Sequence, residues 1–149
     1  MKRGHGVTMA LGLLALVGCA GDRPANLGVR NGLLAPCPSS PNCISSQAAD
    51  DKHRIVPLAV AGDPVLALAR LKHVLERRGD ATFISEQPGY LRVELRTILF
   101  VDDAEFLLDP GARVIHVRSA SRLGYSDLGK NRSRMEEIRS EFIREERTP

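Results

Sequence analysis

The sequence predicts an α+β protein with an antiparallel sheet of about five strands and two helices packed on one face, in the order β-α-β-β-β-β-α. Two stretches with apolar residues at helical spacing stand before and at the end of a run of strand-like segments, and tight turns separate those segments. Strands joined by tight turns pair antiparallel, and helices then cover one face of the sheet. The 149 residues suit one domain, and 43% hydrophobic residues exclude a disordered or collagen-like chain.

The first strand and the first helix are predicted within residues 54–78. Residues 54–60 have strand composition, and Pro57 indicates an edge position because proline cannot donate to a neighbouring strand. Asp63 followed by proline is a typical helix start, and Gly79 a typical helix end, so we expect a helix over residues 65–78. Its apolar stripe consists of Leu68, Leu71 and Leu75.

Four strands and a last helix follow. The strands are predicted at residues 81–86, 91–96, 101–108 and 113–119, separated by turn-forming Pro-Gly sequences at the first and last junctions. The second of them alternates strictly between apolar and charged residues, which is typical of a strand buried on one side. Residues 131–146 have helical spacing, with an apolar stripe formed by Met135, Ile138 and Phe142.

A polar face is predicted on the last two strands. Symmetric pairing across the turn at residues 109–112 places Phe106 opposite Ile115 and Ala104 opposite Val117 on the core side. The opposite side then carries a polar face whose members are Asp103, Glu105 and His116, with Arg118 opposite Asp103. This face is either a functional site or the ordinary charged exterior of a sheet that is covered on one side.

The N-terminus has the pattern of a secretory signal. A basic start, Lys2-Arg3, precedes a short apolar run that ends at Leu16-Val17-Gly18-Cys19. These four residues resemble the lipobox of bacterial lipoproteins, in which cleavage precedes the cysteine and its sulfur receives a diacylglycerol. An ordinary signal peptide, or a buried apolar segment with an incidental cysteine, is the alternative.

The lipoprotein interpretation divides the chain into a signal peptide (residues 1–18), a lipid-anchored flexible tether (19–36) and a single α+β domain (37–149). Acyl chains such as palmitate on Cys19 would hold the domain at the membrane, facing the periplasm. Ala20 follows the cysteine, and by resemblance to the enterobacterial sorting rule this favours the outer membrane. Cleavage lowers the formal net charge from +3 to +1, and no block of basic residues indicates nucleic-acid binding.

Two cysteines remain within the domain. Cys37 and Cys43 enclose a Pro- and Ser-containing turn, which predicts a disulfide in an oxidising compartment, with free thiols as the alternative. Two cysteines supply half of a structural zinc site and no histidine lies at ligand spacing, so we expect no metal.

The densest polar stretch lies between the last strand and the last helix, in residues 118–132. Guanidinium groups, hydroxyl groups and a helix start together suit a phosphate or carboxylate. The predicted ligand-binding residues are Arg118, Ser119, Ser121, Arg122, Tyr125 and Asp127. The alternative is an ordered loop whose side chains bond its own backbone, with Asp127 or Asn131 capping the helix.

Catalysis has little support in the sequence. The chain has no nucleophile-elbow, metalloprotease or phosphate-loop motif, and Asp102 and Asp103, as strand neighbours, point to opposite faces. We therefore expect a non-catalytic protein without a cofactor that binds an anionic small molecule or an envelope protein. The alternatives are a hydrolase or transferase that uses Asp103 and His116, and a purely structural envelope protein with exposed apolar patches.

Three segments carry a resemblance to a known family: residues 36–46 (PCPSSPNCISS), 100–106 (FVDDAEF) and 118–129 (RSASRLGYSDLG). In this order they resemble the bacterial and plastid family called domain of unknown function 1499, and the likeness extends over about residues 36–143. The resemblance implies a small secreted, lipid-anchored or lumenal domain, and it supplies no activity or catalytic residues.

Overall fold

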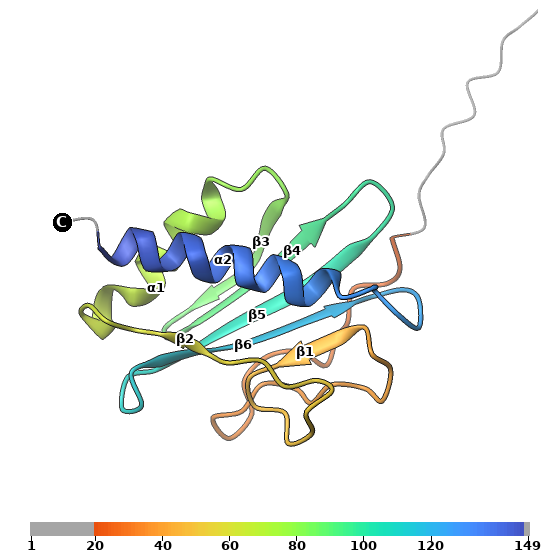
Figure 1. The fold of residues 1–149 in the computed structure, drawn as a ribbon, viewed down its shortest axis with the longest axis horizontal. Coiled ribbons are helices and arrows are strands. Elements are labelled where there is room, and N and C mark those ends of the chain that lie inside the picture. The colour runs from red at the N-terminus through yellow and green to blue at the C-terminus, as the bar shows by residue number, and fades with distance from the viewer. Residues whose placement is uncertain (1–19, 148–149) are drawn as a thin grey trace, which may run out of the picture.

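The computed structural model describes residues 20–147, which form a six-stranded antiparallel sheet with two helices on one face (Figure 1). The predicted α+β class is thereby confirmed. The elements are β1 (Cys43–Ser45), β2 (Leu58–Ala59), α1 (Pro64–Glu76), β3 (Ala81–Gln87), β4 (Tyr90–Arg96), β5 (Val101–Asp109), β6 (Val114–Ser121) and α2 (Lys130–Glu146). The sheet order is β1-β6-β5-β4-β3, and β2 also pairs with β6. The predicted signal peptide and Cys19 lie outside the described residues.

The first strands differ from the prediction. The strand expected at residues 54–60 is reduced to β2, because Pro57 has no N–H to donate and Arg54 makes only an isolated bridge to Ser45. β1 was not predicted, because three residues within a Cys- and Ser-rich segment show no periodicity. It pairs with the end of β6, from Ser45 opposite Arg118 to Cys43 opposite Ala120.

The hairpin of β5 and β6 has the predicted faces but not the predicted pairs. Phe106 lies opposite Val117, not Ile115, because the turn contains four residues and ends with Arg113 at φ 54°. The register is thus shifted by two residues. Since side chains alternate with a period of two, this shift leaves every side chain on its predicted face.

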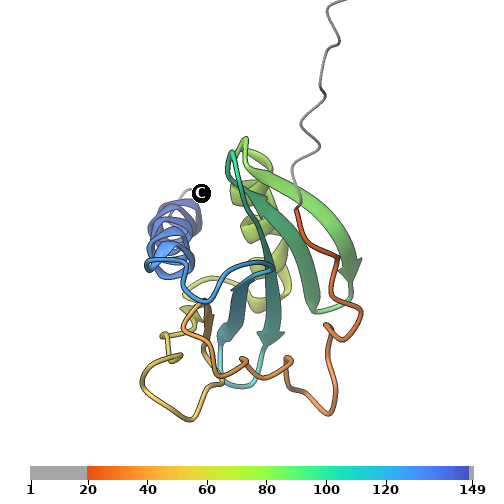
Figure 2. The same cartoon turned by 90° about the vertical axis from the view of Figure 1, so that its right-hand side faces the viewer.

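Both helices pack on the same side of the sheet. Asp63 caps α1 as expected, accepting a hydrogen bond from the Val65 amide at 2.9 Å, with Pro64 in the first turn. Figure 2 shows α2 beside the sheet, and the alternating apolar residues of β4 to β6 face the helices. The fully buried core includes Leu71, Leu75, Val93, Leu95, Ala104, Phe106, Ile115, Val117, Met135, Ile138 and Phe142.

The other side of the sheet is covered by residues 22–36, which we call the strap (Figure 2). The Gly28 amide donates to Glu105 Oε1 at 2.7 Å, and Arg92 donates to the carbonyl oxygen of Pro24 at 3.1 Å. Leu34 is buried. The segment expected to be a flexible tether is therefore bound to the sheet. No helix within residues 20–147 combines the length and apolar character needed to cross a membrane.

Candidate functional site

Eight charged side chains gather between the strap and the sheet. Alternation along β4, β5 and β6 sends most of their charged residues to this side, while the apolar residues between them face the helices. Five guanidinium groups meet three carboxylates, an excess of two positive charges. This ion-pair cluster consists of Arg23, Arg92, Glu94, Arg96, Asp103, Glu105, Arg118 and Arg122.

Arg122 is fully engaged by carboxylates within the cluster. Its Nε donates to Asp103 Oδ2 at 2.7 Å, and its Nη2 donates to Glu94 Oε1 at 2.5 Å. Burial of Glu94 would by itself raise its pKa, but hydrogen bonds and charge from Arg122 and Arg23 outweigh burial and lower this pKa to about 2. The pKa of Arg122 is raised, because Asp103 and Glu94 stabilise its cation. These contacts assign Arg122 a structural role.

Arg118 differs from Arg122. Its side chain is only 7% exposed, and its buried Nε and Nη1 atoms have no acceptor among the described residues. The nearest carboxylate oxygen, Glu105 Oε2, lies 3.6 Å away. Burial lowers the pKa of Arg118, although the charges of Glu105 and Asp103 oppose that effect. Glu105 uses its other oxygen to accept from Tyr90 and Gly28. Arg118 is therefore a buried cation with unused donors.

A cleft of about 390 Å³ lies beside Arg118. The strap lines it with Pro24, Leu27 and Pro36, and Pro38 lines it from the segment that follows the strap. Asp22 also lines the cleft. Arg122 and Asp103 line the cleft as well as Arg118. The volume lies within the range of small-molecule sites, and apolar walls with a few charged groups are typical of such sites.

The predicted disulfide between Cys37 and Cys43 is present. It joins the segment after the strap to the beginning of β1, and so fixes Pro36 and Pro38 near the sheet. His53 supports the same loop, with its Nε2 atom 3.0 Å from the Ser40 carbonyl oxygen and its Nδ1 2.9 Å from Asp50 Oδ1. The cleft wall is thus held covalently and by hydrogen bonds.

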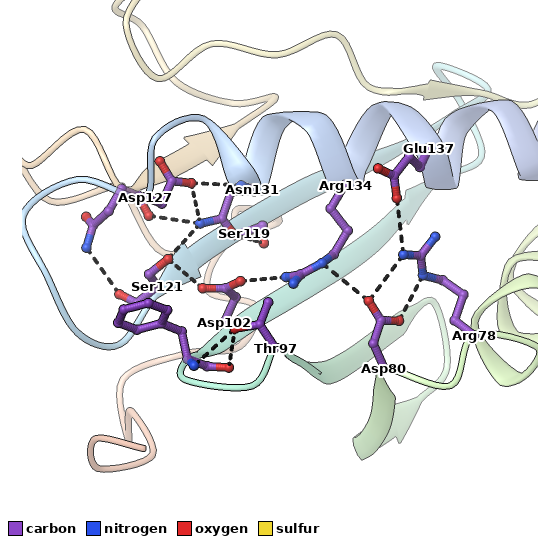
Figure 3. A network of polar contacts seen from close by, with 12 residues as sticks. Arg78, Asp80, Thr97, Asp102, Ser119, Ser121, Asp127, Asn131, Arg134 and Glu137 are labelled. Atoms are coloured by element: carbon purple, nitrogen blue, oxygen red, sulfur yellow. Dashed lines mark hydrogen bonds and ion pairs between the residues drawn. The ribbon is translucent and has the colours of Figure 1, made fainter. Parts of the chain in front are cut away.

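A second polar network lies on the helix side of the sheet (Figure 3). Arg134 of α2 is 1% exposed and donates to Asp102 Oδ2 at 2.5 Å. Ser121 donates to the other oxygen of Asp102, and Asn131 donates to Ser121 at 2.9 Å. The network fixes the beginning of α2 to the start of β5 and the end of β6.

The residues predicted to bind a ligand do not converge on one site. Arg118 and Arg122 face the strap, whereas the hydroxyl groups of Ser119 and Ser121 bond within the network on the opposite side. Asp127 accepts from the Asn131 amide at 2.7 Å and so bonds the first turn of α2, but the N-cap residue is Gly129 and not Asp127 or Asn131 as expected. Tyr125 is 74% exposed. Alternation along a strand separates the guanidinium groups from the serines.

The predicted polar face does not form a catalytic pair. Asp103 lies opposite Ala120, four residues along β6 from His116, a separation of roughly 13 Å. Asp103 is bound to Arg92 and Arg122, whereas His116 Nδ1 lies 3.1 Å from Ser46 Oγ. Within residues 20–147, no group of three or more histidine, cysteine or acidic side chains is placed to hold a metal ion.

Sequence reasoning missed the strap contacts and the buried Arg134. The strap binds largely through backbone groups, for which a sequence carries no signal. Arg134, however, lies three residues after Asn131 and four before Ile138, so it occupies the buried stripe of α2. The spacing of Arg134 from Asn131 and Ile138 would therefore have predicted that Arg134 is buried.

The family model described as "Protein of unknown function (DUF1499)" matches residues 33–142. The chain belongs to the DUF1499 family. No curated protein and no solved structure matches the chain. The range matched to DUF1499 includes the disulfide, all six strands and Arg118, whereas residues 20–32 of the chain precede it.

Proposed function

We propose that this DUF1499 protein is a lipid-anchored, non-catalytic protein of the bacterial envelope that binds an anionic group in the cleft beside Arg118. Residues 1–18 are removed as a signal peptide, and a diacylglycerol on Cys19 anchors the domain in the outer membrane, facing the periplasm. The lipobox-like sequence supports the anchor. The disulfide supports an oxidising compartment.

The observation that carries the binding proposal is the environment of Arg118. A guanidinium group buried without acceptors destabilises a folded protein, because its hydration is lost and not replaced. A carboxylate or phosphate in the cleft would supply acceptors in the planar arrangement that guanidinium groups prefer. The anion can belong to a small molecule or to an envelope protein.

Two matched variants test this proposal. Arg118→Met is expected to lower the free energy of unfolding less than Arg122→Met does, because Arg118 makes no hydrogen bond among the described residues and its one ion pair, with Glu105, is 3.6 Å long. Arg122→Met is expected to lose about 3–5 kcal/mol, because it leaves Glu94 and Asp103 buried without their main partner. Urea unfolding measures both changes.

Calorimetric titration with inorganic phosphate and with acetate then measures binding. We expect the wild-type chain to bind at least one of the two anions and Arg118→Met to bind neither. If the wild-type chain binds neither anion, or if Arg118→Met binds as well as wild type, the proposal of an anion site beside Arg118 is wrong. Equal destabilisation by both variants would instead assign Arg118 a structural role.

A further inference from the structure

Exposed apolar side chains gather on two loops, one between β4 and β5 and one between β6 and α2. Of the twelve large hydrophobic side chains that are exposed within residues 20–147, six lie on these loops. Ile98 is 100% exposed and Leu128 is 96% exposed. We call this set the apolar rim: Ile98, Leu99, Phe100, Leu123, Tyr125 and Leu128. Apolar side chains gathered in this way indicate a contact surface.

The two loops are neighbours in space. Phe100 from one loop and Leu123 and Leu128 from the other line a common pocket of about 170 Å³. The Arg122 amide donates to the Val101 carbonyl oxygen at 3.2 Å, which ties the bases of the two loops together. The apolar rim is therefore one surface at one end of the sheet (Figure 1).

The exposed Leu128 has an unfavourable backbone conformation. Its φ of 53° lies in the left-handed region, which leucine rarely occupies. The chain thus holds a large apolar side chain in water through an unfavourable conformation. Such an outlier is a reason to look for function at this loop.

The N-terminal end of the described chain reaches the same place. A Cβ atom at Gly21 would lie 3.0 Å from the Arg122 Cβ and 3.1 Å from the Leu123 side chain, so the backbone passes directly against the apolar rim. Cys19 is two residues earlier, and two residues span at most roughly 7 Å. A lipid on Cys19 would therefore bring the bilayer to this end of the domain.

We infer that the apolar rim is a membrane-contact surface that enters the interfacial region of the bilayer in which the Cys19 lipid is anchored. The inference rests on the proposed anchor. Apolar loops bind such interfaces through buried area, and tyrosine is favoured at headgroup depth. Lys130, exposed beside the loop between β6 and α2, suits anionic headgroups. Because the strap is bound to the sheet and begins close to Cys19, the lipid and the apolar rim would together orient the domain on the membrane.

The absence of tryptophan from the sequence permits a direct test. Ile98→Trp places a single fluorophore on the apolar rim. Val65→Trp is the matched control, because Val65 is 82% exposed at the start of α1, at the opposite end of the sheet (Figure 1). Each mature variant, acylated at Cys19, is reconstituted in phosphatidylcholine vesicles with and without brominated acyl chains. We expect brominated lipid to reduce the emission of Ile98→Trp and to leave that of Val65→Trp unchanged.

The other outcomes overturn the inference in distinguishable ways. If intact mass shows acylation at Cys19 but neither emission is quenched, membrane contact by the rim is wrong and the anchor stands. Equal quenching of both variants also overturns it. A second copy that covers the rim would shift the Ile98→Trp emission to shorter wavelength without quenching by brominated lipid. A chain that carries no lipid overturns the anchor and this inference together. Leu99→Trp provides a second reporter on the same loop.

Discussion

Arg118 and Arg122 lie on the same face of the sheet but have different partners. Their spacing of four residues puts both on the strap side. Arg122 finds Asp103 and Glu94 within hydrogen-bond distance, whereas Arg118 finds only one oxygen of Glu105, at 3.6 Å. The difference therefore lies in the acceptors that other strands supply and not in the arginines themselves.

Glu94 predicts how the ion-pair cluster responds to acid. Its pKa in the folded protein is about 2, below the ordinary 4.5, because Arg122 and Arg23 outweigh the effect of burial. A lowered folded-state pKa stabilises the protein above the unfolded value, so this stabilisation is fully present above about pH 4.5 and is lost as the pH falls toward 2. Urea unfolding across this pH range measures the loss.

Glu94→Gln is the control for that pH dependence. The variant is less stable at neutral pH, because Arg122 and Arg23 lose a charged partner. Its free energy of unfolding should vary less with pH between 4.5 and 2 than that of wild type. An identical pH dependence in the two proteins would show that Glu94 does not contribute to it.

At the scale of elements, the beginning of α2 depends on a buried cation rather than on apolar contact alone. Arg134 lies between Asp102, at 2.5 Å, and Asp80, at 3.4 Å, with its side chain 2% exposed (Figure 3). Asp80 is in turn bound by Arg78. Through these contacts, α2 is held to β5 and to the turn that follows α1.

Arg134→Met should therefore destabilise the fold by about 3–5 kcal/mol, because it leaves Asp102 buried without its charged partner. Arg132→Met is the matched control on the same helix. Among the described residues, Arg132 makes a single hydrogen bond, to the Lys52 carbonyl oxygen at 3.3 Å, so its loss should cost at most about 0.5 kcal/mol. Chemical denaturation compares the two, and equal losses would contradict this role of Arg134.

The elements that the sequence predicts are those with sustained periodicity. Both helices and the four long strands lie within a few residues of their predicted positions. β1 is too short to show a period, and the register of β5 and β6 depends on a turn in which Arg113 has a positive φ. Because the resulting shift is two residues, the face of Arg118 was predictable although its partner was not.

For the candidate site, the sequence indicates which residues are charged but not which acceptors reach them. It named Arg118 and both cysteines of the disulfide. It could not separate Arg118 from Arg122, because their carboxylate partners come from β4 and β5. The strap remained hidden for a related reason, since backbone groups make two of its contacts with the sheet.

For the whole molecule, the two faces of the sheet are stabilised differently. The helix side buries a continuous apolar core, whereas the strap side buries ion pairs. Leu34 is the one buried hydrophobic residue within the strap. Because the strap buries so little apolar surface, its attachment depends on hydrogen bonds and on the pair between Arg23 and Glu94.

We therefore expect the strap to open without unfolding of the sheet. In native-state hydrogen exchange, the Gly28 amide, which is bound to Glu105, should exchange faster than the amides of Ala104 and Phe106 in β5. Arg23→Ala should raise the Gly28 exchange rate further and leave the β5 rates unchanged. If Gly28 exchanges as slowly as β5, strap and sheet are one cooperative unit. Because the strap walls the cleft, inorganic phosphate bound beside Arg118 should slow Gly28 exchange in wild type but not in Arg118→Met.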